Sequence, residues 1–120
     1  MAKNGGRRKR GPAKPVLMFL VVFRNRKRAD IDAAAYAADA ARMEALARAQ
    51  PGFVSFKGYT ADDGEVIALS EWASADAARA WGSHPDHSAT QSRGRAEYYQ
   101  DYTLYTCDNP RTHHFERPQS

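Results

Sequence analysis

Eight consecutive apolar residues, at positions 16–23, stand out from a chain in which apolar and polar residues otherwise mix closely. Side chains of a β-strand point alternately to two faces, so this run would place four apolar side chains on each face. The pattern predicts a strand buried on both sides, with the residues from Arg24 to Arg28 marking where the chain leaves the core. One face holds Leu17, Phe19, Val21 and Phe23, and the other holds Val16, Met18, Leu20 and Val22.

The same run is a poor membrane or export signal. A bilayer-spanning helix needs roughly 20 apolar residues. The cations from Arg7 to Arg10 resemble the start of a signal peptide, but no A-x-A-like cleavage site follows the run. Cys107 is the only cysteine, which excludes an intramolecular disulfide and agrees with a reducing compartment. We therefore expect a cytoplasmic protein with no membrane span.

A helical pattern follows and extends to about Gln50. Asp30 or Asp32 can cap its start, because a carboxylate accepts hydrogen bonds from the free amides of a first turn. Pro51 and Gly52 end it. Its apolar stripe at helical spacing consists of Tyr36, Ala40, Met43, Leu46 and Ala47.

Three further strands are predicted in the second half of the chain. Residues 53–60 and 65–72 have the pattern of the two arms of a hairpin around the turn sequence Asp62-Asp63-Gly64. Residues 97–107 are aromatic and rich in β-formers, so they predict a fourth strand.

Two short helical segments lie between the hairpin and the last strand. Ser74 is a good N-cap for a helix over 75–81, which Gly82 ends. Proline at the first position favours a second segment over 85–93, ending before Gly94.

This order of elements, β-α-β-β-α-β, predicts the α+β, ferredoxin-like fold with a four-stranded antiparallel sheet. With 120 residues, 42% of them hydrophobic, the chain suits one domain, which we place at 16–108. Both helical segments should cover the same face of the sheet. The economical cover for the other face is a second copy of the same sheet packed around a two-fold axis, so we expect an obligate homodimer.

The charge is concentrated at the N-terminus. Residues 1–14 carry six cations and no acid, so removing them from the net charge of +4 leaves residues 15–120 at about −2. We expect residues 1–15 to form a disordered arm, which either binds a polyanion or merely aids solubility. Residues 109–120 are expected to form a loose tail.

The second half of the chain contains the motifs PGFVSFKGYTADDG, SEW at 70–72, SADAARAW and HPDHSATQ, followed by the aromatic last strand. These motifs resemble the antibiotic biosynthesis monooxygenase (ABM) family, whose members form dimeric α+β barrels. With the first strand and helix, the resemblance covers roughly 16–108.

The resemblance implies oxidation of a small phenolic or quinol-type aromatic by O₂, without flavin or metal. A pocket between sheet and helices would hold the ring, keep it deprotonated and stabilise developing oxygen anion charge. Candidates for the base or hydrogen-bond donor are His84 and His87. Candidates for substrate contacts are Trp72, Trp81, Tyr36, Gln91 and Tyr99.

Two branches of the family can be compared by position. Haem-degrading members have an asparagine on the first strand and an axial histidine ten residues after a tryptophan that corresponds to Trp81. Here Gln91 replaces that histidine, and the apolar run holds no asparagine before Asn25. Haem degradation is therefore not expected.

Polyketide oxygenases of the family retain a tryptophan that corresponds to Trp72. The asparagine and tyrosine expected just upstream of it fall on Ala68 and Leu69, and the helical tyrosine falls on Ala78. These departures argue against a polyketide substrate but not against the fold.

Each candidate also has a structural alternative. Trp72 and Trp81 can serve as core, His84 can cap the turn that follows it, and Cys107 can pack as a small apolar residue. Arg93 can be solvated or can meet an acidic substrate.

No metal or cofactor site is expected. His87 and Gln91 share a helix face, but no carboxylate or cysteine completes a ligand set. His113 and His114 could chelate a metal adventitiously. The chain lacks the phosphate-binding and nucleophile-elbow motifs of the common cofactor and hydrolase classes.

Three functions remain open from the sequence. The first is the oxygenase, and the second is a non-catalytic dimer that binds a small ligand or a partner. The third is nucleic-acid or assembly binding through the N-terminal arm.

Overall fold

The computed structural model describes residues 19–119, which form four strands and three α-helices joined by short turns. The order is β1 (Phe19–Lys27), α1 (Ala33–Arg48), β2 (Phe53–Thr60), β3 (Val66–Trp72), α2 (Ala75–Gly82), α3 (Pro85–Arg93), the π-helical turn η2 (Gly94–Tyr98) and β4 (Tyr99–Asp108). The predicted ferredoxin-like β-α-β-β-α-β order is confirmed. The expected arm at 1–15, and residues 16–18 of the expected first strand, lie outside the described residues.

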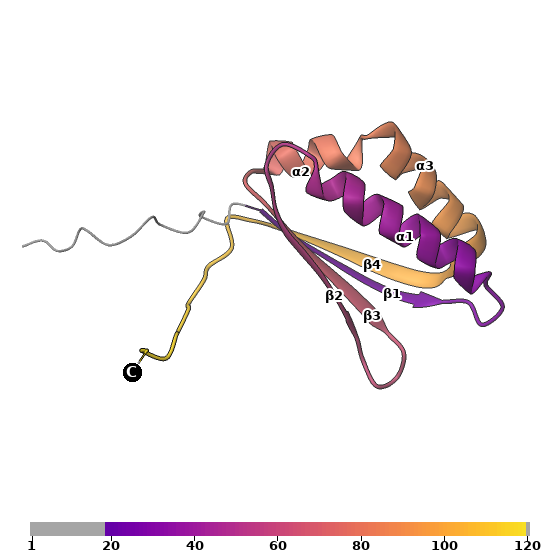
Figure 1. Cartoon of the computed structure of the whole chain (residues 1–120), viewed down its shortest axis with the longest axis horizontal. Coiled ribbons are helices and arrows are strands. Elements are labelled where there is room, and N and C mark those ends of the chain that lie inside the picture. Colours follow the sequence, from indigo (N-terminus) through magenta and orange to yellow (C-terminus); the bar gives the residue numbers. More distant parts are fainter. Residues whose placement is uncertain (1–18, 120) are drawn as a thin grey trace, which may run out of the picture.

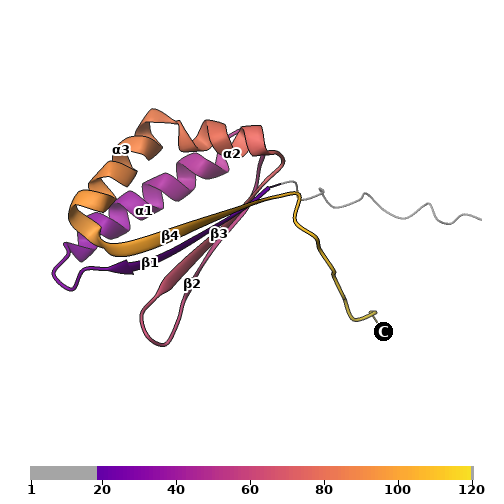
Figure 2. The ribbon, with the colours of Figure 1, turned by 180° about the vertical axis from the view of Figure 1, so that it is seen from behind.

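The strands form one antiparallel sheet in the order β2-β3-β1-β4. All three α-helices lie on the same side of this sheet, as the views from front and back show (Figure 1, Figure 2). The prediction that the helical segments cover one face is therefore confirmed. The other face carries no element from residues 19–119, and we call it the open face.

The first strand does not end at Phe23, as the apolar run suggested, but continues to Lys27. Its backbone stays paired on both sides, since Asn25 lies opposite Val66 of β3 and Tyr102 of β4. Ladder hydrogen bonds on two sides outweigh the polarity of the side chains. The residues after Phe23 therefore belong to the sheet and alternate between its faces.

Alternation separates the polar residues of β1 by face. Arg24 points to the open face and forms an ion pair with Glu65 at 3.1 Å. Arg26 likewise reaches Asp63 at 2.7 Å. Asn25 turns to the helical side and is only 2% exposed. This arrangement places a buried amide at the end of an otherwise apolar strand face.

Of the two capping residues that the sequence offered for α1, Asp32 is the one used. Its Oδ1 accepts a hydrogen bond from the backbone N–H of Ala35 at 3.0 Å. The helix ends at Arg48, and Gly52 adopts a positive φ of 81° in the turn that leads to β2. The Ser74 cap of α2 is also confirmed, with its side chain accepting from the N–H of Ala77.

The end of the second helical region differs from the prediction. Gly94 does not stop the helix: its φ of −58° and ψ of −46° are helical, and a π turn carries the chain on to Tyr98. The last strand consequently begins at Tyr99 instead of residue 97. Contact with α1 explains the shift, because the rings of Tyr98 and Tyr99 both lie edge-on to Tyr36, at 5.3 and 6.3 Å between centroids.

The chain leaves the sheet after Asp108. Residues 109–119 contain no helix or strand and run away from the body of the domain (Figure 1). Phe115 in this segment is 77% exposed. No helix among residues 19–119 is long and apolar enough to cross a membrane.

Gly94 provides a test of the packing at the π turn. A Cβ at this position would lie 2.6 Å from Cε2 of Tyr99, so alanine must displace the ring. We expect Gly94→Ala to lower the free energy of unfolding by about 1–3 kcal/mol, measured by urea denaturation. Gly82→Ala is the matched control, because a Cβ at position 82 would meet no atom within 4 Å and alanine favours the helix. Equal effects of the two substitutions would contradict the close approach of Tyr99 to the turn.

Candidate functional site

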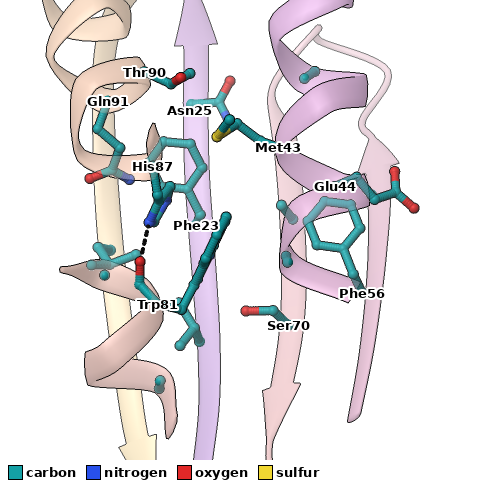
Figure 3. Close-up of a pocket in the computed structure, with 18 of the residues that line it drawn as sticks. Phe23, Asn25, Met43, Glu44, Phe56, Ser70, Trp81, His87, Thr90 and Gln91 are labelled. Atoms are coloured by element: carbon teal, nitrogen blue, oxygen red, sulfur yellow. Dashed lines mark hydrogen bonds between the residues drawn. The ribbon is translucent and has the colours of Figure 1, made fainter. Parts of the chain in front are cut away.

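A cavity of about 600 Å³ lies between the helices and the sheet. All four strands supply its floor, while α1, α2 and α3 supply its walls, and apolar side chains dominate the lining. Figure 3 shows side chains from α1 and from α3 directed into this space from opposite sides. Six of the seven site residues expected from the sequence line it: Trp72, Trp81, His87, Tyr36, Gln91 and Tyr99.

Three stacked rings form one wall of the cavity. Trp72, at the end of β3, is 1% exposed, and its indole N–H donates to Oγ of Ser70 at 3.0 Å. Trp81 lies parallel to it, with centroids 6.3 Å apart and 23° between the planes. His87 stacks on Trp81 at 4.3 Å and 7°. The wall is therefore flat and aromatic, which suits contact with a planar ring.

The protonation of His87 follows from its single hydrogen bond. Its Nδ1 lies 2.9 Å from the carbonyl oxygen of Trp81, the contact marked in Figure 3. A carbonyl oxygen can only accept, so Nδ1 carries the proton and Nε2 has a free lone pair in the neutral ring. Burial lowers the pKa of His87 below its ordinary 6.5, only partly opposed by the bond to Trp81, so the neutral form is present at pH 7.

His84, the other histidine expected at the site, is not part of the cavity lining. It is the N-cap of α3, where its Nδ1 accepts a hydrogen bond from the backbone N–H of Asp86 at 3.2 Å. Its ring lies 5.6 Å from that of Trp81. The contacts of His84 are therefore those of a cap for the turn that follows it, as the structural alternative expected.

Tyrosines surround the opposite end of the cavity. Tyr36 of α1 and Tyr99 of β4 both line it, and the Lys27 ammonium lies 4.6 Å from the centroid of the Tyr36 ring. Burial raises the pKa of Tyr99, and the neighbouring Tyr36 raises it further. Tyr99 therefore stays a neutral phenol that can donate a hydrogen bond.

Asn25 is a cavity residue that the sequence reasoning did not include. Its Oδ1 accepts from Nζ of Lys27 at 2.9 Å, and its Nδ2 lies 3.5 Å from the carbonyl oxygen of Val66. Figure 3 shows the amide near Met43 of α1. The signal was available, since Asn25 is two residues beyond Phe23 on the face formed by Phe19, Val21 and Phe23.

A second group that the sequence did not reveal joins α1 to α3. The carboxylate of Asp39 accepts two hydrogen bonds from Arg93, at 2.9 and 3.1 Å, and one from the hydroxyl of Tyr98 at 3.0 Å. The guanidinium of Arg93 is the main cause that holds the pKa of Asp39 below its ordinary 3.8. Arg93 is thus held by its ion pair with Asp39. We call Asp39, Arg93 and Tyr98 the Asp39 cluster.

The remaining reactive side chains lie elsewhere. Cys107 is exposed and pairs with Leu20 on the open face of the sheet. Nε2 of His114 lies 3.6 Å from Glu116 in the C-terminal segment. Within residues 19–119 no three side chains of histidine, cysteine, aspartate or glutamate come together as a metal site would need.

Comparison with known proteins identifies relatives of this domain. The family model described as "Antibiotic biosynthesis monooxygenase" matches residues 18–93. The uncharacterized protein YqjZ of Bacillus subtilis is 38% identical over 69 residues, which are 58% of this chain. The match spans 60% of the length of that relative.

Solved structures share the fold. Rv0793 of Mycobacterium tuberculosis superimposes with a TM-score of 0.69 at 21% identity, over 79% of this chain and 96% of its own. SnoaB of Streptomyces nogalater, described as a cofactor-independent oxygenase, gives a TM-score of 0.62 at 21% identity, over 86% of this chain and 99% of its own.

The Asp39 cluster predicts a specific pH dependence of stability. The folded pKa of Asp39 lies below 3.8, so its contribution is fully present above about pH 5 and is lost as the pH falls through the folded value. We expect Asp39→Asn to cost about 1 kcal/mol at pH 7, a low figure because solvent partly screens the pair. The difference in thermal stability between parent and variant should shrink at acid pH.

Glu44→Gln is the control, because it removes a carboxylate from the more exposed Glu44–Arg48 pair on the same helix. Its effect should stay under about 0.5 kcal/mol. A difference between parent and Asp39→Asn that is the same at pH 3 and pH 7 would refute the assignment.

Proposed function

This chain belongs to the antibiotic biosynthesis monooxygenase family, and we propose that it is a monooxygenase that oxidises a small phenolic or quinol-type aromatic with O₂. The observation that carries the proposal is the state of His87. It presents an unprotonated Nε2 in a cavity whose wall is a stack of two indoles. A base beside a flat aromatic surface suits removal of a proton from a bound ring.

The proposed reaction begins with this proton transfer. The phenolic or enolic hydroxyl of the substrate gives its proton to Nε2 of His87, which forms the imidazolium. The resulting anion is electron-rich and passes one electron to O₂, so the substrate becomes a radical and O₂ becomes superoxide. The two radicals combine at a ring carbon to form a carbon–oxygen bond.

The second half of the reaction completes the balance. The peroxide takes the proton back from His87, and its oxygen–oxygen bond breaks with loss of water. One oxygen atom stays on the substrate as a carbonyl and the other leaves in water, so the organic substrate supplies all four electrons. No flavin or metal is required in this scheme, in line with the description of SnoaB, whose fold this chain shares.

The side chains of the cavity would have separate roles. Trp72 and Trp81 would bind the ring by stacking, and their bulk would keep water from the superoxide. Tyr36, Gln91 and Tyr99 would contact the substrate from α1, α3 and β4. His84 would not contact the substrate; it would cap the N-terminus of α3, the helix that carries His87.

We also propose that the active form is a homodimer joined through the open face. Val22 of β1 lies directly opposite Leu69 of β3 on this face, and Ile67 lies beside them. Tyr59 and Tyr105, each 49% exposed, flank these residues on the outer strands. A second copy would bury this apolar strip and cover the second side of β1.

The enzymatic proposal is tested by O₂ uptake with a panel of hydroquinones, naphthohydroquinones and anthrone. We expect His87→Ala to lower the rate by roughly 100-fold or more, the usual range for loss of a general base. The parent rate should fall as the pH drops through the pKa of His87, which lies below 6.5, because the imidazolium cannot accept a proton.

His84→Ala is the matched control. Loss of the cap should cost about 1 kcal/mol of stability and leave the rate within about twofold, since His84 does not line the cavity. If the parent consumes no O₂ with any of these compounds, or if His87→Ala is as active as the parent, the enzymatic function is wrong. A non-catalytic dimer that binds a small ligand or a partner, and binding through the N-terminal arm, would then be the candidates left.

The dimer has its own test in light scattering at micromolar concentration. The expected mass is twice the 13.4 kDa of one chain. Leu69→Lys should give monomers, because it places a charge in the middle of the apolar strip. Ala89→Lys, on the exposed side of α3, should leave the dimer intact. A parent protein of monomer mass would exclude this assembly.

A further inference from the structure

The amide of Asn25 is the most completely buried polar side chain of the cavity. It is 2% exposed and lies at the end of the apolar face of β1, among the lining residues. An amide has a donor side and an acceptor side that differ little in shape. Which side faces the cavity decides what chemical group a ligand must present there.

Lys27 determines the orientation of this amide. Its Nζ lies 2.9 Å from Oδ1 of Asn25. An ammonium group can only donate hydrogen bonds, so the atom that it contacts must be the oxygen. The NH₂ group therefore points the other way, toward the carbonyl oxygen of Val66, which is an acceptor. The contacts with Lys27 and with Val66 therefore favour the same orientation of the amide.

The position of Lys27 is itself set by the fold. The pairing of β1 with β4 shifts register between Arg26 and Lys27, and such an irregularity redirects the side chains of a strand. The ammonium then lies over the ring of Tyr36, 4.6 Å from its centroid. A cation in this position is attracted to the face of the ring. Lys27 is thus held from two sides, by Tyr36 and by Asn25.

The NH₂ group has spare donor capacity. It carries two N–H bonds, and the contact with Val66 is long, at 3.5 Å. Among residues 19–119 the second N–H has no other hydrogen-bond partner. A buried donor without a partner favours any ligand that can accept from it, because folding has already removed this donor from water.

We propose that Lys27 is a positioning residue that orients Asn25 so that an N–H faces the cavity, and that the ligand presents an acceptor oxygen there. The chemical class is an aromatic with a carbonyl or an oxyanion at one end, and a donor group at that end is rejected. The inference rests on the proposed function only in taking this cavity as the substrate site. It adds the specificity of the Asn25 end of the cavity, which lies at the other end of the β1–β3 pairing from Trp72, and names Lys27 as its cause.

Three bicyclic probes of one skeleton separate the possibilities by titration calorimetry. 1-Indanone carries an acceptor, indole carries an N–H donor at the corresponding position, and indane carries neither. We expect the parent to bind 1-indanone roughly fivefold more tightly than indane, the gain of one hydrogen bond to a buried donor. Indole should bind no more tightly than indane.

Substitutions at Lys27 then test the cause. Lys27→Met removes the donor that contacts Oδ1 and leaves only the long 3.5 Å contact of Nδ2 with Val66 to hold the amide. The amide can then turn over, and the preference for 1-indanone over indole should fall to about twofold or less. Lys27→Arg keeps a cationic donor and should retain the preference. Indane should bind all of these proteins equally, which a general loss of cavity structure would not allow. Asn25→Asp replaces the NH₂ by an oxygen, so it should favour indole over 1-indanone.

Each outcome decides the matter. If the parent shows no preference for 1-indanone, or Lys27→Met keeps the full preference, the inference is wrong. If Lys27→Met fails to fold, Lys27→Gln replaces it, since a glutamine can accept as well as donate and so permits both orientations. O₂ uptake tests the proposed function separately. If the parent prefers 1-indanone but oxidises no quinol, the inference about Asn25 stands and the proposed function is wrong. If the parent oxidises a quinol but shows no preference for 1-indanone, the proposed function stands and the inference is wrong.

Discussion

The central strand β1 is the element on which the rest of the structure depends. It is hydrogen-bonded to β3 on one side and to β4 on the other, and the side chains of residues 19–23 are apolar on both faces. Backbone pairing on both edges places it in the middle of the sheet, and burial on one face requires the helices. The cavity floor, the buried Asn25 and the uncovered open face all follow from this one strand and its alternation.

The chemistry of the cavity depends on how a short helix begins. His84 and Pro85 start α3, so the third helical residue, His87, turns back toward Trp81 and donates from Nδ1 to its carbonyl oxygen. This bond leaves Nε2 without a proton in the neutral ring, and the stack on the indole of Trp81 fixes the plane of the ring. Two histidines three residues apart therefore have different contacts: His84 caps the backbone of α3, and His87 lines the cavity, where the proposed reaction would use it as the base.

Local signals made much of the fold predictable. Asp32, Ser74 and Pro85 start the three helices as capping and proline preferences indicate, and the hairpin follows from alternation and turn chemistry. The failures lie at ends of elements, where distant contacts decide. β1 continues past Phe23 because β3 pairs with it as far as Asn25 and β4 as far as Lys27. The helix continues past Gly94 because Tyr98 reaches Asp39. The Asp39 cluster itself joins residues more than 50 positions apart, so no local pattern marks it.

The sequence by itself determined the element order, the helix starts, and the aromatic and histidine residues that could gather around a ring, because these depend on neighbours along the chain. Only the tertiary structure decided that His87 and not His84 faces the cavity, since that requires the path of α3 relative to the sheet. It alone also turned Asn25 inward beside Lys27 and brought Asp39 to Arg93. Hydrogen bonds and burial act over a few ångströms in space, and those distances are set by the packing of elements that are far apart in the chain.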